Sequence, residues 1–102
     1  MAYRTPVYTT AAALPLPQYS QAVKYNGLAY CSGSLGIDPK TDELVLGTVT
    51  DRTRMALRNL EAILLAAGSG MDRVIKAIVF FFDMGDFNAM NEAWDHFFPR
   101  RP

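Results

Sequence analysis

Few residue types in this chain of 102 residues are placed to do chemistry. Its single cysteine, Cys31, stands in an apolar stretch, which predicts a buried, inert thiol rather than a nucleophile. Its single histidine, His96, falls near the end of an expected helix, where histidine favours the negative end of the helix dipole. The sequence carries no metal-ligand spacing, no Gly-rich phosphate loop and no nucleophile elbow. The residue types and spacings alone therefore give a thin catalytic inventory.

Composition argues against several classes of partner. Ten basic and ten acidic residues give a formal net charge of zero, and no basic stripe indicates a nucleic-acid surface. The densest basic cluster, Arg52, Arg54 and Arg58, is expected on the solvated face of a helix. No apolar stretch approaches the length of a membrane span, and the first residues lack the apolar core of a signal peptide. We therefore expect that the protein binds neither nucleic acid nor a membrane. We expect a cytoplasmic location and leave a mitochondrial location open.

A β-hairpin over residues 20–32 is the first element that the pattern predicts strongly. Asn26-Gly27 is the preferred pair for a two-residue type I′ turn, because both positions need positive φ. An extended lead-in over residues 1–18, with a short edge strand near Tyr8, is expected before the hairpin, since its prolines exclude a helix. Turn-forming residues predict a loop over 36–47 after it.

Two helices and a further strand are expected in the second half. Helical spacing predicts a helix from about Asp51 to Ala67, with Thr50 as its N-cap and Gly68 in the left-handed conformation that ends it. A second helix is expected over 87–98, capped by Asp86. The apolar stripes of the two helices are Ala56, Leu60, Ile63, Leu64 and Ala67 in the first, and Phe87, Met90, Trp94 and Phe97, with Phe98 alongside, in the second.

The segment between the helices, residues 74–82, is rich in β-branched and aromatic residues and predicts a strand. Its apolar side chains do not alternate, so both faces of the strand would need to be covered. Two helices in one small domain cover one face, and the other face is a candidate subunit interface. The order of elements predicts a single domain over 1–102 of the α+β class, with a mixed sheet and both helices on one face.

The ordered set of short motifs resembles the reactive-intermediate deaminase (RidA/YjgF) family. The matching segments are Gln18-Tyr19-Ser20-Gln21-Ala22, Ser32-Gly33-Ser34, Asp38-Pro39-Lys40-Thr41-Asp42, Asn59-Leu60, Ala66-Ala67-Gly68, Val74-Ile75-Lys76 and Asp83-Met84-Gly85-Asp86-Phe87-Asn88-Ala89-Met90-Asn91. The resemblance implies a chorismate-mutase-like fold and homotrimers with small-molecule clefts between subunits. It also implies hydrolysis of reactive imines and enamines, such as a 2-imino acid to a 2-oxo acid plus ammonia, with no metal or organic cofactor.

Carried over by position, the resemblance implies a site built around five residues. Tyr19 and Ser32 would be its catalytic residues, and Gly33, Ser34 and Asn91 would bind substrate or shape the cleft. Ser34 stands where the family has glutamine, and Gly36 stands where it often has proline, so the turn beside the cleft is reshaped.

The resemblance also implies two further strands, which these 102 residues do not include. In the family, the first of those strands supplies an arginine that holds the substrate carboxylate, and the last supplies a glutamate that orients the attacking water. We therefore expect a domain truncated at its C-terminus relative to the family, with an exposed sheet edge. Two hypotheses follow: an imine deaminase, acting on a 2-imino acid or on a related imine of a specialised pathway, or a non-catalytic trimeric scaffold that binds a metabolite or a partner protein.

Overall fold

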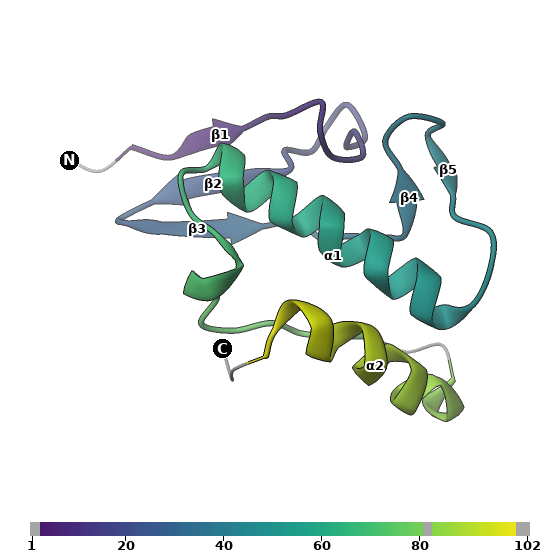
Figure 1. The fold of residues 1–102 in the computed structure, drawn as a ribbon. Helices are drawn as coiled ribbons and strands as arrows, with labels where there is room; N and C mark the ends of the chain where they lie inside the picture. Colours follow the sequence, from purple (N-terminus) through teal and green to yellow (C-terminus); the bar gives the residue numbers. More distant parts are fainter. Residues whose placement is uncertain (1–2, 81–82, 100–102) are drawn as a thin grey trace.

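The computed structural model describes residues 3–80 and 83–99, in which two helices and two small antiparallel sheets form an α+β fold (Figure 1). The α+β class expected from the sequence is confirmed. The first sheet has the strand order β1 (Thr5–Val7), β2 (Ala22–Tyr25) and β3 (Leu28–Cys31), and the second pairs β4 (Ile37–Asp38) with β5 (Glu43–Leu44). The helices are α1 (Val49–Ala66) and α2 (Phe87–Phe97), with short 3₁₀ turns η1 (Met71–Arg73) and η2 (Met84–Asp86).

The predicted hairpin is confirmed and sets the two faces of the first sheet. Asn26 and Gly27 have φ angles of 51° and 79°, as a type I′ turn requires. The register pairs Ala22 with Cys31 on the face toward α1, where both contribute to the core. That core is a cluster of small and aliphatic side chains: Val7, Ala12, Ala22, Ile63 and Ala67, with Ala29, Cys31 and Ala62 packed against it.

The opposite face of the hairpin is apolar but uncovered within the described residues. The register places Val23 opposite Tyr30 and Tyr25 opposite Leu28 on this face. Tyr30 is 57% exposed and Leu28 45% exposed. Because side chains alternate along a strand, this face is the one that points away from α1. We call these four residues the outer hairpin face.

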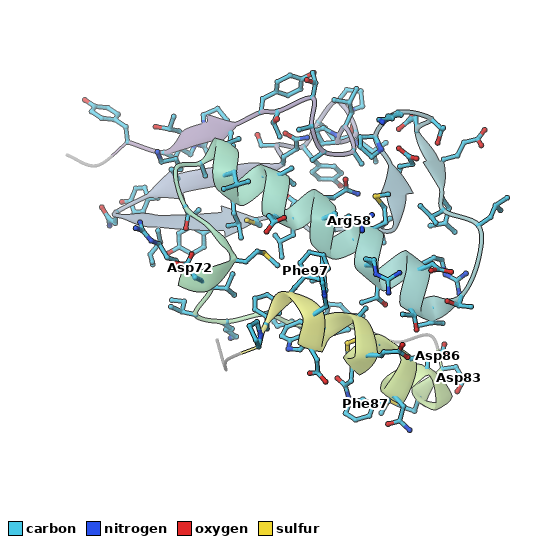
Figure 2. All side chains as sticks on the ribbon, viewed as in Figure 1. Arg58, Asp72, Asp83, Asp86, Phe87 and Phe97 are labelled. Carbon is cyan, nitrogen blue, oxygen red and sulfur yellow. The ribbon has the colours of Figure 1, made fainter. Side chains whose placement is uncertain are left out.

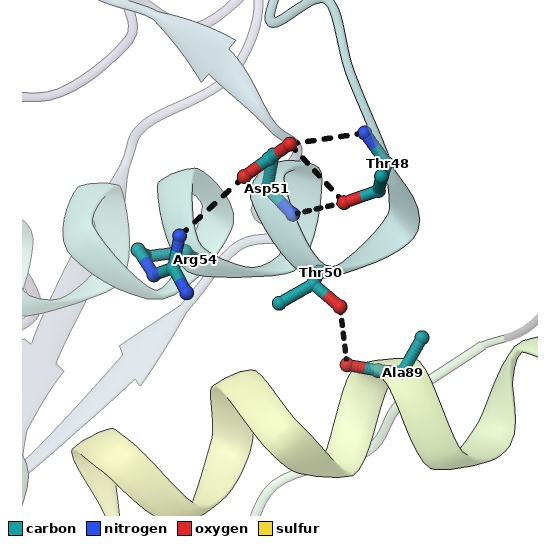
Figure 3. A network of polar contacts seen from close by, with 5 residues as sticks. All are labelled: Thr48, Thr50, Asp51, Arg54 and Ala89. Carbon is teal, nitrogen blue, oxygen red and sulfur yellow. Dashed lines mark hydrogen bonds and ion pairs between the residues drawn. The ribbon is translucent and has the colours of Figure 1, made fainter.

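Helix α1 begins at Val49, two residues earlier than the sequence predicted. Its N-cap is Thr48, and Thr50, the residue expected there, lies inside the helix. The Thr48 hydroxyl accepts from the Asp51 N–H at 3.2 Å, and the Asp51 carboxylate accepts from the Thr48 N–H at 3.1 Å (Figure 3). This reciprocal capping box outweighs the single cap offered by Thr50, because it satisfies two backbone donors rather than one. The Thr50 hydroxyl instead donates to the Ala89 carbonyl of α2 at 3.0 Å.

The end of α1 follows the sequence prediction. Gly68 has a φ angle of +82°, in the left-handed region that favours glycine. Its N–H donates to the Leu65 carbonyl at 3.0 Å, and the Ser69 N–H donates to the Leu64 carbonyl at 2.8 Å. This pair of bonds is the Schellman arrangement that satisfies the last carbonyls of a helix.

The strand predicted over residues 74–82 is not observed. Residues 74–80 have no strand pairing, and residues 81 and 82 lie outside the described residues. Phe80 is 91% exposed, Ile75 75% and Ile78 66%, so neither face of this segment is covered. The sequence pattern reports the preference of single residues for a pleated surface, but a strand also needs a hydrogen-bonding neighbour. No described segment supplies one here.

Helix α2 packs along α1, and together they bury a second apolar layer. The buried residues of the two helices outside the first cluster include Leu57 and Leu64 on α1 and Met90 and Ala93 on α2. Asp86 is the N-cap residue of α2, as the sequence predicted, but its side chain makes no capping hydrogen bond. Asp83 caps the preceding 3₁₀ turn η2 instead, because its side chain accepts from the Gly85 N–H at 2.8 Å (both acids are labelled in Figure 2). Within the described residues, no helix combines the length and apolar character needed to cross a membrane.

Two buried amide side chains join the lead-in segment to the sheet and to α1. Gln21 and Asn59 are each only 3% exposed. The Gln21 amide accepts from the Thr9 N–H at 2.7 Å and donates to the carbonyls of Thr9 and Ala13, both at 3.0 Å. The Asn59 amide accepts from the Ala13 N–H at 3.2 Å. Ala13 is therefore held through both of its backbone polar groups.

Asn59 also holds the segment that follows the hairpin. Its side-chain nitrogen donates to the Leu35 carbonyl at 3.1 Å and to the Ile37 carbonyl at 2.7 Å. One side chain of α1 thus satisfies three backbone groups from two segments that lie 22 or more residues away. A buried amide whose donors and acceptor are all paired fixes geometry more strictly than an apolar side chain, because each lost bond leaves a buried polar group.

We expect Asn59→Ala to lower the free energy of unfolding by about 3 kcal/mol, because three part-buried backbone groups lose their partner. Asn59→Asp should be destabilising as well, since a carboxylate cannot donate to two carbonyls. Urea unfolding monitored by circular dichroism measures both. Arg58→Gln, at the neighbouring and exposed position of the same helix, is the control and should leave stability unchanged. Equal stability of Asn59→Ala and wild type would contradict the anchoring role.

The capping box predicts a dependence of stability on pH. Hydrogen bonds from the Thr48 backbone and then from its side chain lower the pKa of Asp51 below its ordinary value of 3.8. A depressed carboxyl pKa stabilises the folded state above the unfolded pKa, and this contribution is lost as the pH falls through the folded pKa. Asp51→Asn should therefore lower the melting temperature at pH 7 by more than at pH 3. Asp95→Asn, an exposed acid of α2, is the control, and an Asp51→Asn effect that is constant with pH would contradict this assignment.

Candidate functional site

The hairpin brings two of the predicted site residues, Tyr19 and Ser32, to the same end of the first sheet. The Ser32 N–H donates to the Gln21 carbonyl at 3.0 Å, which extends the β2–β3 ladder by one step. The Ser32 hydroxyl donates to the Ser20 carbonyl at 2.6 Å. Tyr19 precedes Ser20 directly and closes a turn through its N–H bond to the Leu16 carbonyl at 2.9 Å. Residues 13 apart in sequence therefore lie on adjacent backbone at the strand ends.

The hydroxyl groups of Tyr19 and Ser32 differ in the hydrogen bonds that they can offer a substrate. The Ser32 hydroxyl already donates its hydrogen to the Ser20 carbonyl, so only its oxygen lone pairs can accept a hydrogen bond from a substrate. The Tyr19 side chain is 61% exposed, and its hydroxyl makes no hydrogen bond within the described residues. Tyr19 therefore offers a free hydroxyl donor to a ligand at this end of the sheet.

The next residues run from the sheet to α1. The Ser34 hydroxyl donates to the Ala56 carbonyl at 2.6 Å, which fastens this segment to the helix. At Gly36 the backbone passes so close to α1 that an added Cβ would lie 2.6 Å from the Arg52 carbonyl oxygen. Gly33 is exposed, and a Cβ there would meet nothing within 4 Å. Ser34 therefore serves as an anchor within the described residues, while Gly33 leaves the surface beside Ser32 open.

The fifth predicted residue, Asn91, lies on α2 and is half-buried. No hydrogen bond, ion pair or shared hollow joins it to Tyr19, Ser32, Gly33 or Ser34 among residues 3–80 and 83–99. The main packing partner of α2 is α1 rather than the hairpin. The structure thus brings four of the five residues into two adjacent turns and leaves Asn91 apart from them.

Burial raises the pKa of the Cys31 thiol above its ordinary value of 9.0. The thiol is therefore protonated near neutral pH, and a protonated thiol is a poor nucleophile. Its position against the core cluster matches the predicted inert thiol. Within the described part of the chain, no group of three or more His, Cys, Asp or Glu side chains could hold a metal ion.

Two hollows on the surface of the described residues lie elsewhere. One, of about 250 Å³, is lined by Ala11, Asp38, Pro39, Lys40, Met55, Arg58 and Asn59, and a second, of about 300 Å³, is lined by Asp38, Thr41, Glu43, Leu44, Val45 and Leu46. Neither contains a residue predicted for the site. Sequence reasoning placed Arg58 on a solvated face and gave no separate role to Lys40. The sequence contains one weak indication of this hollow. Asn59, next to Arg58, is a polar residue four positions before the core residue Ile63, a spacing that places Asn59 and Ile63 on the same face of the helix.

Comparison with known proteins places the chain in a family. A family model described as Endoribonuclease L-PSP matches residues 9–102. This chain belongs to the RidA/YjgF family. It is 44% identical over 92 residues to a RutC family protein of Pyrococcus horikoshii, covering 90% of this chain and 73% of that protein. It is 40% identical over 95 residues to 2-iminobutanoate/2-iminopropanoate deaminase of Mus musculus, covering 93% of this chain and 70% of that protein.

Solved structures of the family have the same arrangement of elements. Yeast Mmf1 matches with a TM-score of 0.94 at 30% identity, covering 98% of this chain and 79% of that one. TdcF of E. coli matches with a TM-score of 0.88 at 33% identity, covering 93% of this chain and 74% of that one, and its structure holds bound serine. Some relatives of this RidA/YjgF chain are named as mitochondrial or chloroplastic proteins, so family membership does not fix a location.

Proposed function

We propose that this chain hydrolyses reactive imine or enamine intermediates, converting a 2-imino acid to a 2-oxo acid plus ammonia, or acting on a related imine of a specialised pathway. The observation that carries the proposal is the 40% identity, over 93% of this chain, to a mouse protein named for that activity. The free Tyr19 hydroxyl beside Ser32 supports it, because it offers a hydrogen-bond donor at the position implied by the family motif.

The proposed reaction needs orientation more than a strong acid or base. Water adds to the carbon of the C=N bond as one of its protons passes to the nitrogen, and the proton of the new hydroxyl group then passes to the same nitrogen. The resulting tetrahedral carbon then expels ammonia and leaves the C=O group of the 2-oxo acid. The Tyr19 hydroxyl would donate to an oxygen or nitrogen substituent of the developing tetrahedral carbon, and the Ser32 oxygen would accept from the substrate nitrogen or the water. No metal or organic cofactor takes part in this proposal.

We propose further that the chain acts as a homotrimer with small-molecule clefts between subunits. The outer hairpin face and residues 74–80 support an assembly, because both are apolar and exposed within the described residues. Contiguous exposed apolar surface on a soluble protein is typical of an interface. The sequence pattern predicted a subunit interface on the second apolar face of a strand over residues 74–82. The hairpin face is better supported, because regular pairing fixes which of its side chains point outward.

If the outer hairpin face is a subunit interface, Tyr30→Glu should weaken assembly, because it places a charge in an apolar contact. Light scattering coupled to size-exclusion chromatography should give the mass of an oligomer for wild type and a smaller mass for Tyr30→Glu. Leu46→Glu is the control, since Leu46 is 94% exposed on a different surface and should leave the mass unchanged. A wild-type chain that stays monomeric at micromolar concentration would contradict the proposed trimer.

A second candidate function is a non-catalytic scaffold that binds a small metabolite or a partner protein. It is favoured by one observation: within the described residues, no carboxylate, imidazole or cation hydrogen-bonds to Tyr19 or Ser32. A carboxylate ligand is normally held by charge-assisted bonds, and these two residues alone provide none. One experiment separates the candidates. An amino-acid oxidase generates 2-iminopropanoate in the presence of semicarbazide, which traps the imine. Hydrolysis by the chain competes with this trapping and is measured as a decrease in the trapped product.

We expect the chain to accelerate imine loss and Tyr19→Phe to lower kcat/KM about fivefold or more, as one lost hydrogen bond to the transition state implies. The melting temperature should hold, because the substitution removes an exposed hydroxyl and no packing. Tyr8→Phe, which removes a hydroxyl from a tyrosine 66% exposed outside the site, is the matched control and should have no effect. Binding of a 2-oxo acid without any turnover would favour the scaffold. Loss of stability with unchanged turnover in Tyr19→Phe would make Tyr19 a structural anchor.

A further inference from the structure

The hollow between α1 and the start of the β4–β5 hairpin has the features of a second small-molecule site. Its volume is about 250 Å³, which suits a molecule of a few heavy atoms. Three segments from distant parts of the sequence form its walls: Ala11 of the lead-in, residues 38–40, and one face of α1. None of its lining residues belongs to the site around Tyr19.

The walls of this hollow are held in place rather than loosely apposed. Asn59 lines it, and the bonds of its amide to Ala13, Leu35 and Ile37 fix the lead-in and the start of β4 against α1. Both N–H groups of the Asn59 amide are therefore used within the protein. Only the second lone pair of its oxygen could bond to a ligand. The shape of the hollow is set before any ligand arrives, which lowers the entropy cost of binding.

Two cationic side chains line the hollow without a protein partner. Neither Lys40 nor Arg58 has its side chain in a hydrogen bond or ion pair within the described residues. The other arginines near the start of α1 are engaged: Arg54 pairs with Asp51 at 3.4 Å, and Arg52 donates to the Gly47 carbonyl at 2.8 Å. Figure 2 shows Arg58 on the side of α1 that faces β4.

The charge and polarity of the lining select the kind of ligand. Asp38 is the acid of the hollow, and one of its carboxylate oxygens already accepts from the Lys40 N–H at 2.8 Å. Two cations against one carboxylate leave a formal surplus of one positive charge, which matches a monoanion better than a dianion. Met55, Pro39 and Ala11 add apolar wall, which matches a short hydrocarbon chain.

We propose that this hollow binds a small organic monocarboxylate. The planar fork of the Arg58 guanidinium would hold both carboxylate oxygens, Lys40 would add a point charge, and the apolar wall would cover the hydrocarbon chain. The site is independent of the proposed imine hydrolysis, because it uses none of the residues proposed for that reaction.

The test is a titration of the isotope-labelled chain with butanoate at low salt, followed by NMR amide shifts. We expect saturable shifts at Ala11, at residues 38–40 and around Arg58. The Kd should rise about tenfold in Arg58→Gln, as loss of a charge-assisted pair implies. Lys40→Gln should weaken binding in the same direction. Added NaCl should weaken it too, because exposed charges are screened within about 8 Å at 0.15 M.

Three controls make the outcome decisive. Arg54→Gln removes the same charge one turn away on α1 and should leave the Kd unchanged, and so should Tyr19→Phe. Shifts that stay linear with concentration, or that fall equally in Arg54→Gln and Arg58→Gln, would overturn the proposal in favour of general charge attraction. Tighter binding of inorganic phosphate than of butanoate would overturn the assignment to a monocarboxylate. Failure of imine hydrolysis alone would leave this proposal untouched.

Discussion

The buried Asn59 side chain joins three segments of the structure through hydrogen bonds, and the arrangement of the loops depends on it. From the middle of α1 it reaches the lead-in segment at Ala13 and the post-hairpin segment at Leu35 and Ile37. Ala13 and Leu35 lie outside the paired strands, and Ile37 is the first residue of β4, a strand of two residues. Without the amide, the two segments would each need another way to satisfy buried backbone groups. Gln21 repeats the device from the start of β2, so the loops are fixed by amides and the layers by apolar packing.

The dependence on amides explains why the local elements were predictable and their connections were not. Asn26-Gly27 and Gly68 dictate backbone conformation within a few residues, and both positions have the expected positive φ. Asn59 was read as part of a family motif, and the sequence gives no sign of which backbone groups a helical asparagine will meet. The same limit explains the helix start, where Thr48 and Thr50 are both good caps: the capping box with Asp51 makes Thr48 the cap, and the Thr50 hydroxyl bonds to Ala89 of α2.

Residues 74–80 show a different limit of sequence reasoning. The preference of Ile75, Ile78 and Phe80 for a pleated surface is a property of the residues, and it predicted a strand. Strand formation is a property of a pair of segments, and no described segment pairs with this one. The segment is left exposed, and the outer hairpin face is also apolar and exposed. Both surfaces have the composition of buried structure without a cover among the described residues.

The candidate site divides along the same line between local and non-local placement. Tyr19 and Ser32 were predictable together, because a hairpin with a fixed turn brings its two ends side by side whatever surrounds it. Asn91 depends on how α2 sits relative to the sheet, and α2 packs on α1 instead. Lys40 and Arg58 line the same hollow, whose walls on β4 and α1 are joined by the bond from the Asn59 amide to the Ile37 carbonyl. A site whose parts are joined through one buried amide is visible in the sequence only after the bonds of that amide are known.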